Sequence, residues 1–241
     1  MRTRSKWMFA LIFCGSVFPA MAKDIVLETN SSQVRLLELF SSEGCSSCPP
    51  AETWLSNLQN NSELWKSIVP VSFHVTYWDY LGWTDRFARP EYTQRQQEYA
   101  ALWNSESVYT PAFVVNGAEW KGWFRGQELA GAETSNPGKL TVRINGDQVA
   151  VQFAANQKDN YKLYLAPLGM NLSSKVGAGE NNGRHLRHDF VALNLASSAL
   201  QPTEGKWAAV LNVNWQDAKA VAVWITRSGS LVPIQAVGGF L

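Results

Sequence analysis

Cysteine is scarce in this chain, which has three among its 241 residues: Cys14, Cys45 and Cys48. A protein held together by disulfides would be expected to link distant segments, because a cross-link stabilises most when it closes a long loop. Cys45 and Cys48 are close neighbours in sequence, so a bridge between them closes almost nothing. The sequence therefore argues against a disulfide-stapled scaffold and for a chemical purpose of the pair. A passive local disulfide is the alternative.

A long hydrophobic run is also missing from the N terminus. The apolar segment 7–18 would span about 18 Å as a helix, against ~30 Å for the core of a bilayer. Basic residues precede this segment and Ala20-Met21-Ala22 follows it, which is typical of a secretory signal peptide. Lipid attachment at Cys14 is disfavoured, because Phe13 stands where such a signal carries a small residue. We predict a signal peptide over 1–22, a periplasmic or secreted protein, and no stable membrane span after cleavage.

An excess of basic residues is absent as well. The predicted signal peptide holds three of the 21 Lys and Arg residues and no acidic residue, so 18 basic residues face 20 acidic ones in the rest of the chain. No basic stripe indicates a nucleic-acid partner. Apolar residues make up 46% of the chain and include 11 Trp, which is ample for burying cores. The length after residue 22 favours two domains over one.

The segment after the signal peptide alternates strand and helix patterns. Buried-strand patterns at 34–40 and 69–75 flank a helical segment introduced by two prolines, and a second helix is expected from about 90 to 103. Asn116-Gly117 then predicts a hairpin. This order predicts an α/β N-terminal domain over residues 23–134, and together with the cysteine pair Cys45 and Cys48 it resembles a thioredoxin-like domain.

The pattern changes at the turn-rich segment 135–138, which we interpret as a linker. Short β-type segments follow it to the end of the chain, the first two joined by a hairpin signal at Asn145-Gly146. We predict a predominantly β, sandwich-like C-terminal domain over residues 135–241. The glycine-rich segment 177–184 lacks the spacing of a nucleotide-binding loop, so we interpret it as a turn that docks the two domains or lines a groove.

Cys45 and Cys48 form a Cys-x-x-Cys motif, whose spacing lets two sulfurs meet within one turn of chain. Such a pair cycles between dithiol and disulfide with little backbone movement. If Cys45 lies at the start of the helix that Pro49 and Pro50 introduce, free backbone N–H groups and the positive helix end favour its thiolate. We predict Cys45 as the nucleophile and Cys48 as the resolving thiol. Pro50 restricts regular helical bonding to begin near Cys48, which leaves Cys45 outside the helix and exposed enough to attack.

Two further positions are expected to serve this pair. Glu38 lies on the strand that leads to the cysteines, and a buried carboxylate beneath them would relay the proton when the resolving thiol is activated. An exposed or ion-paired strand residue is the alternative. Thr110-Pro111 enters a later strand, and a cis proline opposite the cysteines is a hallmark of thioredoxin-like redox domains. We predict a cis bond here and assign Thr110 and Pro111 to substrate binding.

His74 ends the second predicted strand and leads into an aromatic segment that contains Tyr77 and Trp78. We interpret this segment as a lid or substrate platform over the cysteines, with core packing as the alternative. His74 would stabilise a thiolate or supply a third copper ligand, and a structural histidine is the alternative. We assign His74, Tyr77 and Trp78 to substrate binding.

A zinc site is not expected. Zinc usually takes four ligands, and the chain has no second Cys-x-x-Cys pair to complete a set with the first. The histidines are scattered along the sequence, and we interpret His185 and His188 as surface residues of a glycine- and asparagine-rich segment. We therefore predict neither a metal nor a cofactor.

Several segments resemble those of the DUF1223 family of bacterial secreted proteins, which is assigned to the thioredoxin-like superfamily. They are LELFSSEGCSSCPPAE, SFHVTYWDYLGWTDRFA, YTQRQ, VYTPAFVVNG and GAGENNGRHL. The resemblance covers nearly all of the chain after the signal peptide. It implies a fold and a cysteine pair and names no substrate.

The leading hypothesis is an exported thiol-disulfide oxidoreductase that exchanges disulfides with envelope proteins through Cys45 and Cys48. Its partners would be exported protein thiols or disulfides and a separate redox partner. One alternative is a periplasmic Cu(I)-binding protein or chaperone that uses the same two thiolates. Another is an envelope interaction module without turnover.

Overall fold

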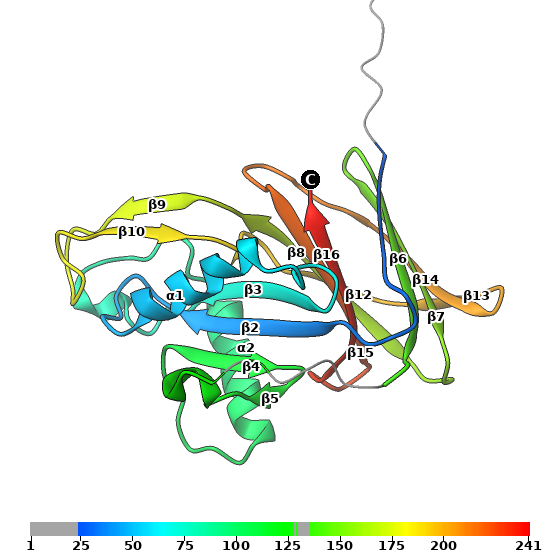
Figure 1. The fold of residues 1–241 in the computed structure, drawn as a ribbon, viewed down its shortest axis with the longest axis horizontal. Helices are drawn as coiled ribbons and strands as arrows, with labels where there is room; N and C mark the ends of the chain where they lie inside the picture. Colours follow the sequence, from blue (N-terminus) through cyan, green and yellow to red (C-terminus); the bar gives the residue numbers. More distant parts are fainter. Residues whose placement is uncertain (1–23, 128, 130–134) are drawn as a thin grey trace, which may run out of the picture.

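The computed structural model describes residues 24–127, 129 and 135–241, so the predicted signal peptide lies outside the described residues. These residues form a mostly β structure with two short α-helices, α1 (Cys48–Asn57) and α2 (Pro90–Leu102). The strands make up several sheets (Figure 1). The predicted fold class, an α/β thioredoxin-like domain followed by a β domain, is therefore wrong.

The largest sheet has nine strands in the order β16-β15-β8-β11-β3-β2-β4-β5, with β12 also paired to β8. Parallel pairing of β2 with β3 lies inside it, and every residue of these two strands is buried, as expected for strands covered on both faces. The bounds of the nine strands are β2 (Arg35–Ser41), β3 (Ile68–His74), β4 (Ala112–Val115), β5 (Ala118–Glu119), β8 (Tyr161–Gly169), β11 (Val191–Ala192), β12 (Ala196–Ala199), β15 (Ala220–Arg227) and β16 (Pro233–Phe240).

The strand that pairs with the second edge of β3 explains why the predicted fold class is wrong. A local pattern shows that this strand is buried, but it does not show which strand pairs with its second edge. In the structure β11 takes that edge, where Val191 pairs in parallel with Ser72. The core is shared as well, because Trp224 of β15 contacts Phe73 of β3 with ring centroids 6.4 Å apart. Segments on both sides of residue 135 thus build one sheet and one core.

A second sheet has five strands in the order β1-β6-β7-β14-β13. Burial alternates along β6, so one of its faces covers a second core against the nine-stranded sheet. The hairpins predicted at Asn116-Gly117 and Asn145-Gly146 are both present. The bounds of the five strands are β1 (Ile25–Glu28), β6 (Gly138–Asn145), β7 (Gln148–Ala155), β13 (Gln201–Thr203) and β14 (Lys206–Asn212).

A small third sheet pairs β9 (Leu172–Lys175) with β10 (His185–His188). It lies at the end of the molecule away from the five-stranded sheet, and β10 contacts α1 (Figure 1). Side chains of β10 alternate between solvent and interior, so His185 is exposed and His188 is buried. This alternation brings a histidine from late in the sequence against the helix that carries Cys48. Within the described residues, no helix is long and apolar enough to span a membrane.

Candidate functional site

The cysteine pair lies in the turn between β2 and α1. Cys45 and Cys48 form a disulfide, and their Cα atoms are 5.5 Å apart. Helix α1 begins at Cys48, with Pro49 and Pro50 in its first turn, so Cys45 lies just before the helix as predicted. The positive end of the α1 dipole therefore lies at the pair.

Burial of the pair differs from our expectation of an exposed Cys45. Both Cys45 and Cys48 are 0% exposed, whereas Ser46 and Ser47 between them are exposed. The loop is thus at the surface while its two cysteine side chains are turned inward. A spacing motif could not show this, because the covering groups come from distant segments.

Thr110 and Trp78 are two of these covering groups. The Thr110 carbonyl oxygen lies 3.7 Å from Cys45 Sγ, and the Thr110-Pro111 bond is cis as predicted. Trp78 Nε1 donates a hydrogen bond to Thr110 Oγ1 at 2.7 Å. Trp78 also lies against Gly44, where an added Cβ would come within 2.8 Å of the Trp78 Cβ. Glycine at position 44 therefore permits the close approach of the Trp78 backbone and Cβ to the cysteine loop.

The segment 177–184 holds the cysteine loop from another side. Asn181 is fully buried, and its Nδ2 donates to the carbonyl oxygens of Glu43 and Cys45, both at 2.9 Å. Glu180 Oε2 accepts a hydrogen bond from the Ser46 N–H at 2.9 Å, and this bond lowers the pKa of Glu180. The segment 177–184 therefore contacts the cysteine loop directly.

Tyr77 occupies a different environment from its neighbour Trp78. Its hydroxyl donates to Gln96 Oε1 at 3.1 Å, and burial raises the pKa of Tyr77 to about 12. Both aromatic side chains are partly buried against the main core. Trp78 contacts the segment beside the cysteines, while Tyr77 ties the same loop to α2.

Glu38 does not take the place that we predicted beneath the cysteines. Its carboxylate is fully buried and accepts hydrogen bonds from Arg95 Nε and the Tyr99 hydroxyl, both at 2.6 Å. These are its hydrogen bonds within the described residues, so the ion-paired alternative is the one found. The side chain of Glu38 faces α2, whereas the cysteines lie at the start of α1.

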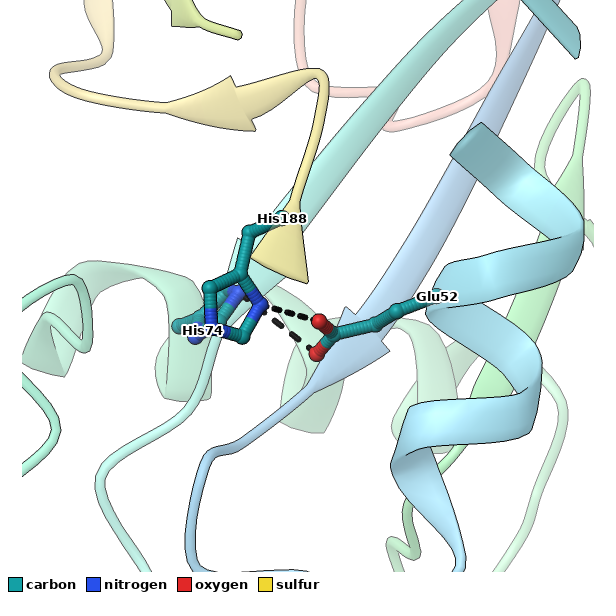
Figure 2. A group of neighbouring side chains, drawn as sticks. All are labelled: Glu52, His74 and His188. Carbon is teal, nitrogen blue, oxygen red and sulfur yellow. Dashed lines mark hydrogen bonds and ion pairs between the residues drawn. The ribbon is translucent and has the colours of Figure 1, made fainter. Parts of the chain in front are cut away.

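A second buried carboxylate, Glu52, lies one helical turn after Cys48 on α1. Figure 2 shows it facing two histidines, His74 from the end of β3 and His188 from the end of β10. Glu52 Oε1 is 3.7 Å from His74 Nε2, and Glu52 Oε2 contacts His188 Nδ1. The Ser41 hydroxyl also donates to Glu52 Oε1.

The other ring nitrogen of each histidine contacts a further carboxylate. His74 Nδ1 lies 2.7 Å from Asp85 Oδ2, and His188 Nε2 lies 3.1 Å from Glu43 Oε1. All five side chains are nearly or fully inaccessible to solvent. We call Glu43, Glu52, His74, Asp85 and His188 the carboxylate–histidine cluster.

Opposite charges outweigh burial at Glu52, His74, Asp85 and His188. Burial lowers the pKa of His188, but the Glu52 carboxylate and hydrogen bonds to Glu43 and Glu52 raise it overall to about 10. Burial also opposes charge on His74, yet the Asp85 carboxylate raises its pKa. The pKa values of Glu52 and Asp85 are lowered by the histidines despite burial. These shifts favour the charged forms of both histidines and of Glu52 and Asp85.

A family model with the description "Protein of unknown function (DUF1223)" matches residues 36–226. The chain belongs to the DUF1223 family. The match includes the cysteine pair, Thr110 and the carboxylate–histidine cluster, so the residues around α1 all lie within the DUF1223 region. No curated protein matches the chain.

Two solved structures show the same overall fold as this DUF1223 chain. Protein AGR_C_4864 from Agrobacterium tumefaciens has a TM-score of 0.60 and 24% identity, over 87% of this chain and 94% of that one. HBP35 of Porphyromonas gingivalis has a TM-score of 0.60 and 15% identity, over 88% of this chain and 76% of that one. At these identities the likeness concerns the fold alone.

The sequence of this DUF1223 protein gave weak signals for the residues that we missed. Glu52 lies four positions after Cys48, a spacing that places both on one face of a helix. His188 was interpreted as a surface residue, because its segment is rich in glycine and asparagine. In the structure β10 turns it inward against Glu52. The side chain of His74 points to Asp85 and Glu52.

Proposed function

We propose that this protein is a bacterial secreted or periplasmic thiol-disulfide oxidoreductase that exchanges disulfides with exported proteins through Cys45 and Cys48. The observation that supports the proposal most is the bridge between the two cysteines at the start of α1. The N-terminal end of a helix stabilises a thiolate, which is the attacking species in disulfide exchange. The signal-peptide pattern before residue 23 supports export.

The position of the bridge supports chemistry over a stapling role. Cys45 and Cys48 are three positions apart and join no distant segments. Contacts of the core already hold α1 on β2, since Leu55 and Phe40 belong to the same buried cluster. Chain cross-linking over so short a loop adds little stability. Reversible reduction is therefore the use that fits this bridge.

The exchange proceeds in two steps that conserve electrons. In the reducing direction, the Cys45 thiolate attacks a substrate disulfide, forms a mixed disulfide and releases one substrate thiolate. The Cys48 thiolate then attacks Cys45 Sγ, which restores the Cys45–Cys48 bridge and releases the second substrate thiol. Two electrons pass from the protein to the substrate, and the reverse sequence oxidises a substrate dithiol. A separate redox partner resets the pair.

The test uses the Cys48→Ser variant, which lacks the resolving thiol. We expect it to accumulate mixed disulfides with envelope proteins at Cys45, visible as bands on non-reducing gels that a reductant removes. Cys45→Ser is the matched control and should give none. The purified wild-type protein should also speed the reduction of insulin disulfides when a dithiol reductant is supplied, or oxidise a reduced protein. Absence of mixed disulfides together with absence of both activities would overturn the proposal.

Export is tested separately by fractionating cells and sequencing the N terminus of the mature chain. We expect the protein outside the cytoplasm, beginning at Lys23 after cleavage behind Ala22. A cytoplasmic chain that retains residues 1–22 would contradict the export part of the proposal. It would not affect the proposed disulfide exchange, which the mixed-disulfide gels test separately.

A further inference from the structure

Three ligand atoms of the carboxylate–histidine cluster converge on one point beside α1. A carboxylate oxygen of Glu52 and one nitrogen each from His74 and His188 lie within 4.8 Å of one another, and Figure 2 shows the three side chains facing each other. The 3.7 Å between His74 Nε2 and Glu52 Oε1 compares with about 3.3 Å between ligands of a tetrahedral zinc ion, given Zn–N bonds of about 2.0 Å. This one distance is thus close to that in a zinc site.

His74 Nε2 is an independent sign that a ligand is missing. The side chain is fully buried, and this nitrogen has no hydrogen-bond partner within the described residues. Glu52 Oε1, with which it forms an ion pair, is beyond hydrogen-bonding distance at 3.7 Å. A buried polar atom without a partner is costly and rare. The unpartnered nitrogen points into the space between Glu52 and His188.

The outer contacts of the two histidines suit metal binding as well. Histidines that bind metals generally donate their second ring N–H to a carboxylate or carbonyl. Asp85 accepts from His74 Nδ1 at 2.7 Å, so Nε2 is the nitrogen that would bind a metal once it has lost its proton. Glu43 accepts from His188 Nε2 at 3.1 Å, so Nδ1, which contacts Glu52, is the nitrogen that would bind a metal once it has lost its proton. Both of these nitrogens lie beside Glu52.

Those outer carboxylates are themselves held in place. Glu43 Oε2 accepts a hydrogen bond from Trp83 Nε1 at 2.7 Å, and Asp85 Oδ2 accepts one from the Glu43 N–H at 2.8 Å. The ligand side chains come from α1, β3 and β10. The site is therefore supported on regular elements and by a second layer of hydrogen bonds.

The charge of the cluster also suits a cation. Three carboxylates are buried with two imidazoles, and within the described residues their ion pairs are with these imidazoles alone. One divalent cation carries the same charge as two protonated imidazoles. Imidazole and carboxylate ligands suit divalent first-row transition metals, whereas Cu(I) favours the thiolates that this set lacks.

We propose that Glu52, His74 and His188 bind one divalent transition-metal ion of the zinc type, with Asp85 and Glu43 orienting the two histidines. The proposal goes beyond disulfide exchange and does not depend on it. It replaces our sequence-based expectation of no metal. Three protein ligands leave one position of a tetrahedral ion for water or another small ligand.

The test titrates Zn²⁺ into the full mature chain with its disulfide intact, after removal of metals with a chelator and of the chelator by desalting. Isothermal titration calorimetry should show one ion bound per chain. We expect His188→Ala and His74→Ala each to weaken binding by at least about 100-fold, since even a lost outer contact costs 10–100-fold. Failure of the wild-type protein to bind one equivalent would overturn the proposal.

Two controls separate this site from other sources of zinc binding. His185→Ala removes the exposed histidine of the same strand, β10, and should leave the affinity unchanged. The double variant Cys45→Ser/Cys48→Ser should also bind normally, so its result is distinct from that of the redox test. Loss of binding in either control, or normal binding in both histidine variants, would contradict the assignment.

A measurement on the wild-type protein covers the case in which a histidine variant does not fold, as judged by circular dichroism. X-ray absorption at the zinc edge of the loaded protein should show nitrogen and oxygen neighbours, including imidazole scattering, and no sulfur. A sulfur neighbour would assign the metal to the cysteines and overturn the proposal.

Discussion

Glu38 and Glu52 are both buried carboxylates, but their surroundings differ. Glu38 of β2 accepts hydrogen bonds from Arg95 and Tyr99, and its charge is met by a permanently charged guanidinium. Glu52 of α1 faces His74 and His188, where one ring nitrogen lacks a hydrogen-bond partner among the described residues. Burial alone therefore does not distinguish a structural carboxylate from one that we propose as a metal ligand. The difference is that His74 Nε2, beside Glu52, has no hydrogen-bond partner among the described residues.

The largest change in unfolding free energy is expected at Glu38, to which the comparison assigns a purely structural role. Glu38→Gln leaves Arg95 buried without its counter-charge, which typically costs about 3–5 kcal/mol of unfolding free energy. Urea denaturation measures this loss. Zinc affinity of the folded fraction should be unchanged, and a loss of zinc binding would break the distinction between the two carboxylates. Glu28→Gln, which removes an exposed ion pair with Lys139, is the matched control and should leave stability nearly unchanged.

The second-largest effect is the increase in unfolding free energy that a bound zinc ion gives. Zinc at 100 times its dissociation constant should raise the unfolding free energy of wild-type protein by about 2.7 kcal/mol, because it binds the folded state. Glu52→Gln should lose this increment, while Glu38→Gln should retain it. Denaturation with zinc and with a chelator measures both. An equal increment in the two variants would show that Glu52 is not a ligand.

A smaller effect is expected from the orienting residue Asp85. Asp85→Asn keeps the size of the side chain but removes the charge that faces His74 Nδ1. We expect zinc affinity to fall by about 10–100-fold, with one ion still bound per chain. Calorimetry on Asp85→Asn and on His74→Ala measures which of the two variants loses more zinc affinity. A loss as large as that of His74→Ala would make Asp85 a ligand instead of an orienting residue.

The smallest effect concerns Glu180, an exposed residue that accepts a hydrogen bond from the Ser46 N–H. Because its pKa is lowered in the folded protein, its contribution is present above the ordinary value of 4.5 and is lost as pH falls through the lower folded value. The stability difference between wild type and Glu180→Gln should therefore shrink on acidification. Urea denaturation of both proteins at several pH values measures this difference. A difference that does not change with pH would contradict the hydrogen bond between Glu180 and the Ser46 N–H.

Local features of the backbone were predictable from the sequence, and the long-range arrangement was not. The Cys45–Cys48 bridge, the helix start at Cys48 and the two hairpins follow from local spacing and turn residues. Glu38 was assigned to the cysteines because a strand pattern shows burial but not which neighbour a side chain meets. Arg95, its partner, is 57 positions away.

By itself, the sequence determined the cysteine spacing, the alternation of its strands and the resemblance to DUF1223, because these depend on residues close together in the chain. The tertiary structure decided the rest. Pairing of β11 with β3 joined segments from both sides of residue 135 in one sheet. The inward turn of β10 then placed His188 against Glu52, 136 positions earlier. No local pattern carries such a contact, since it exists only after distant strands have paired and buried the groups together.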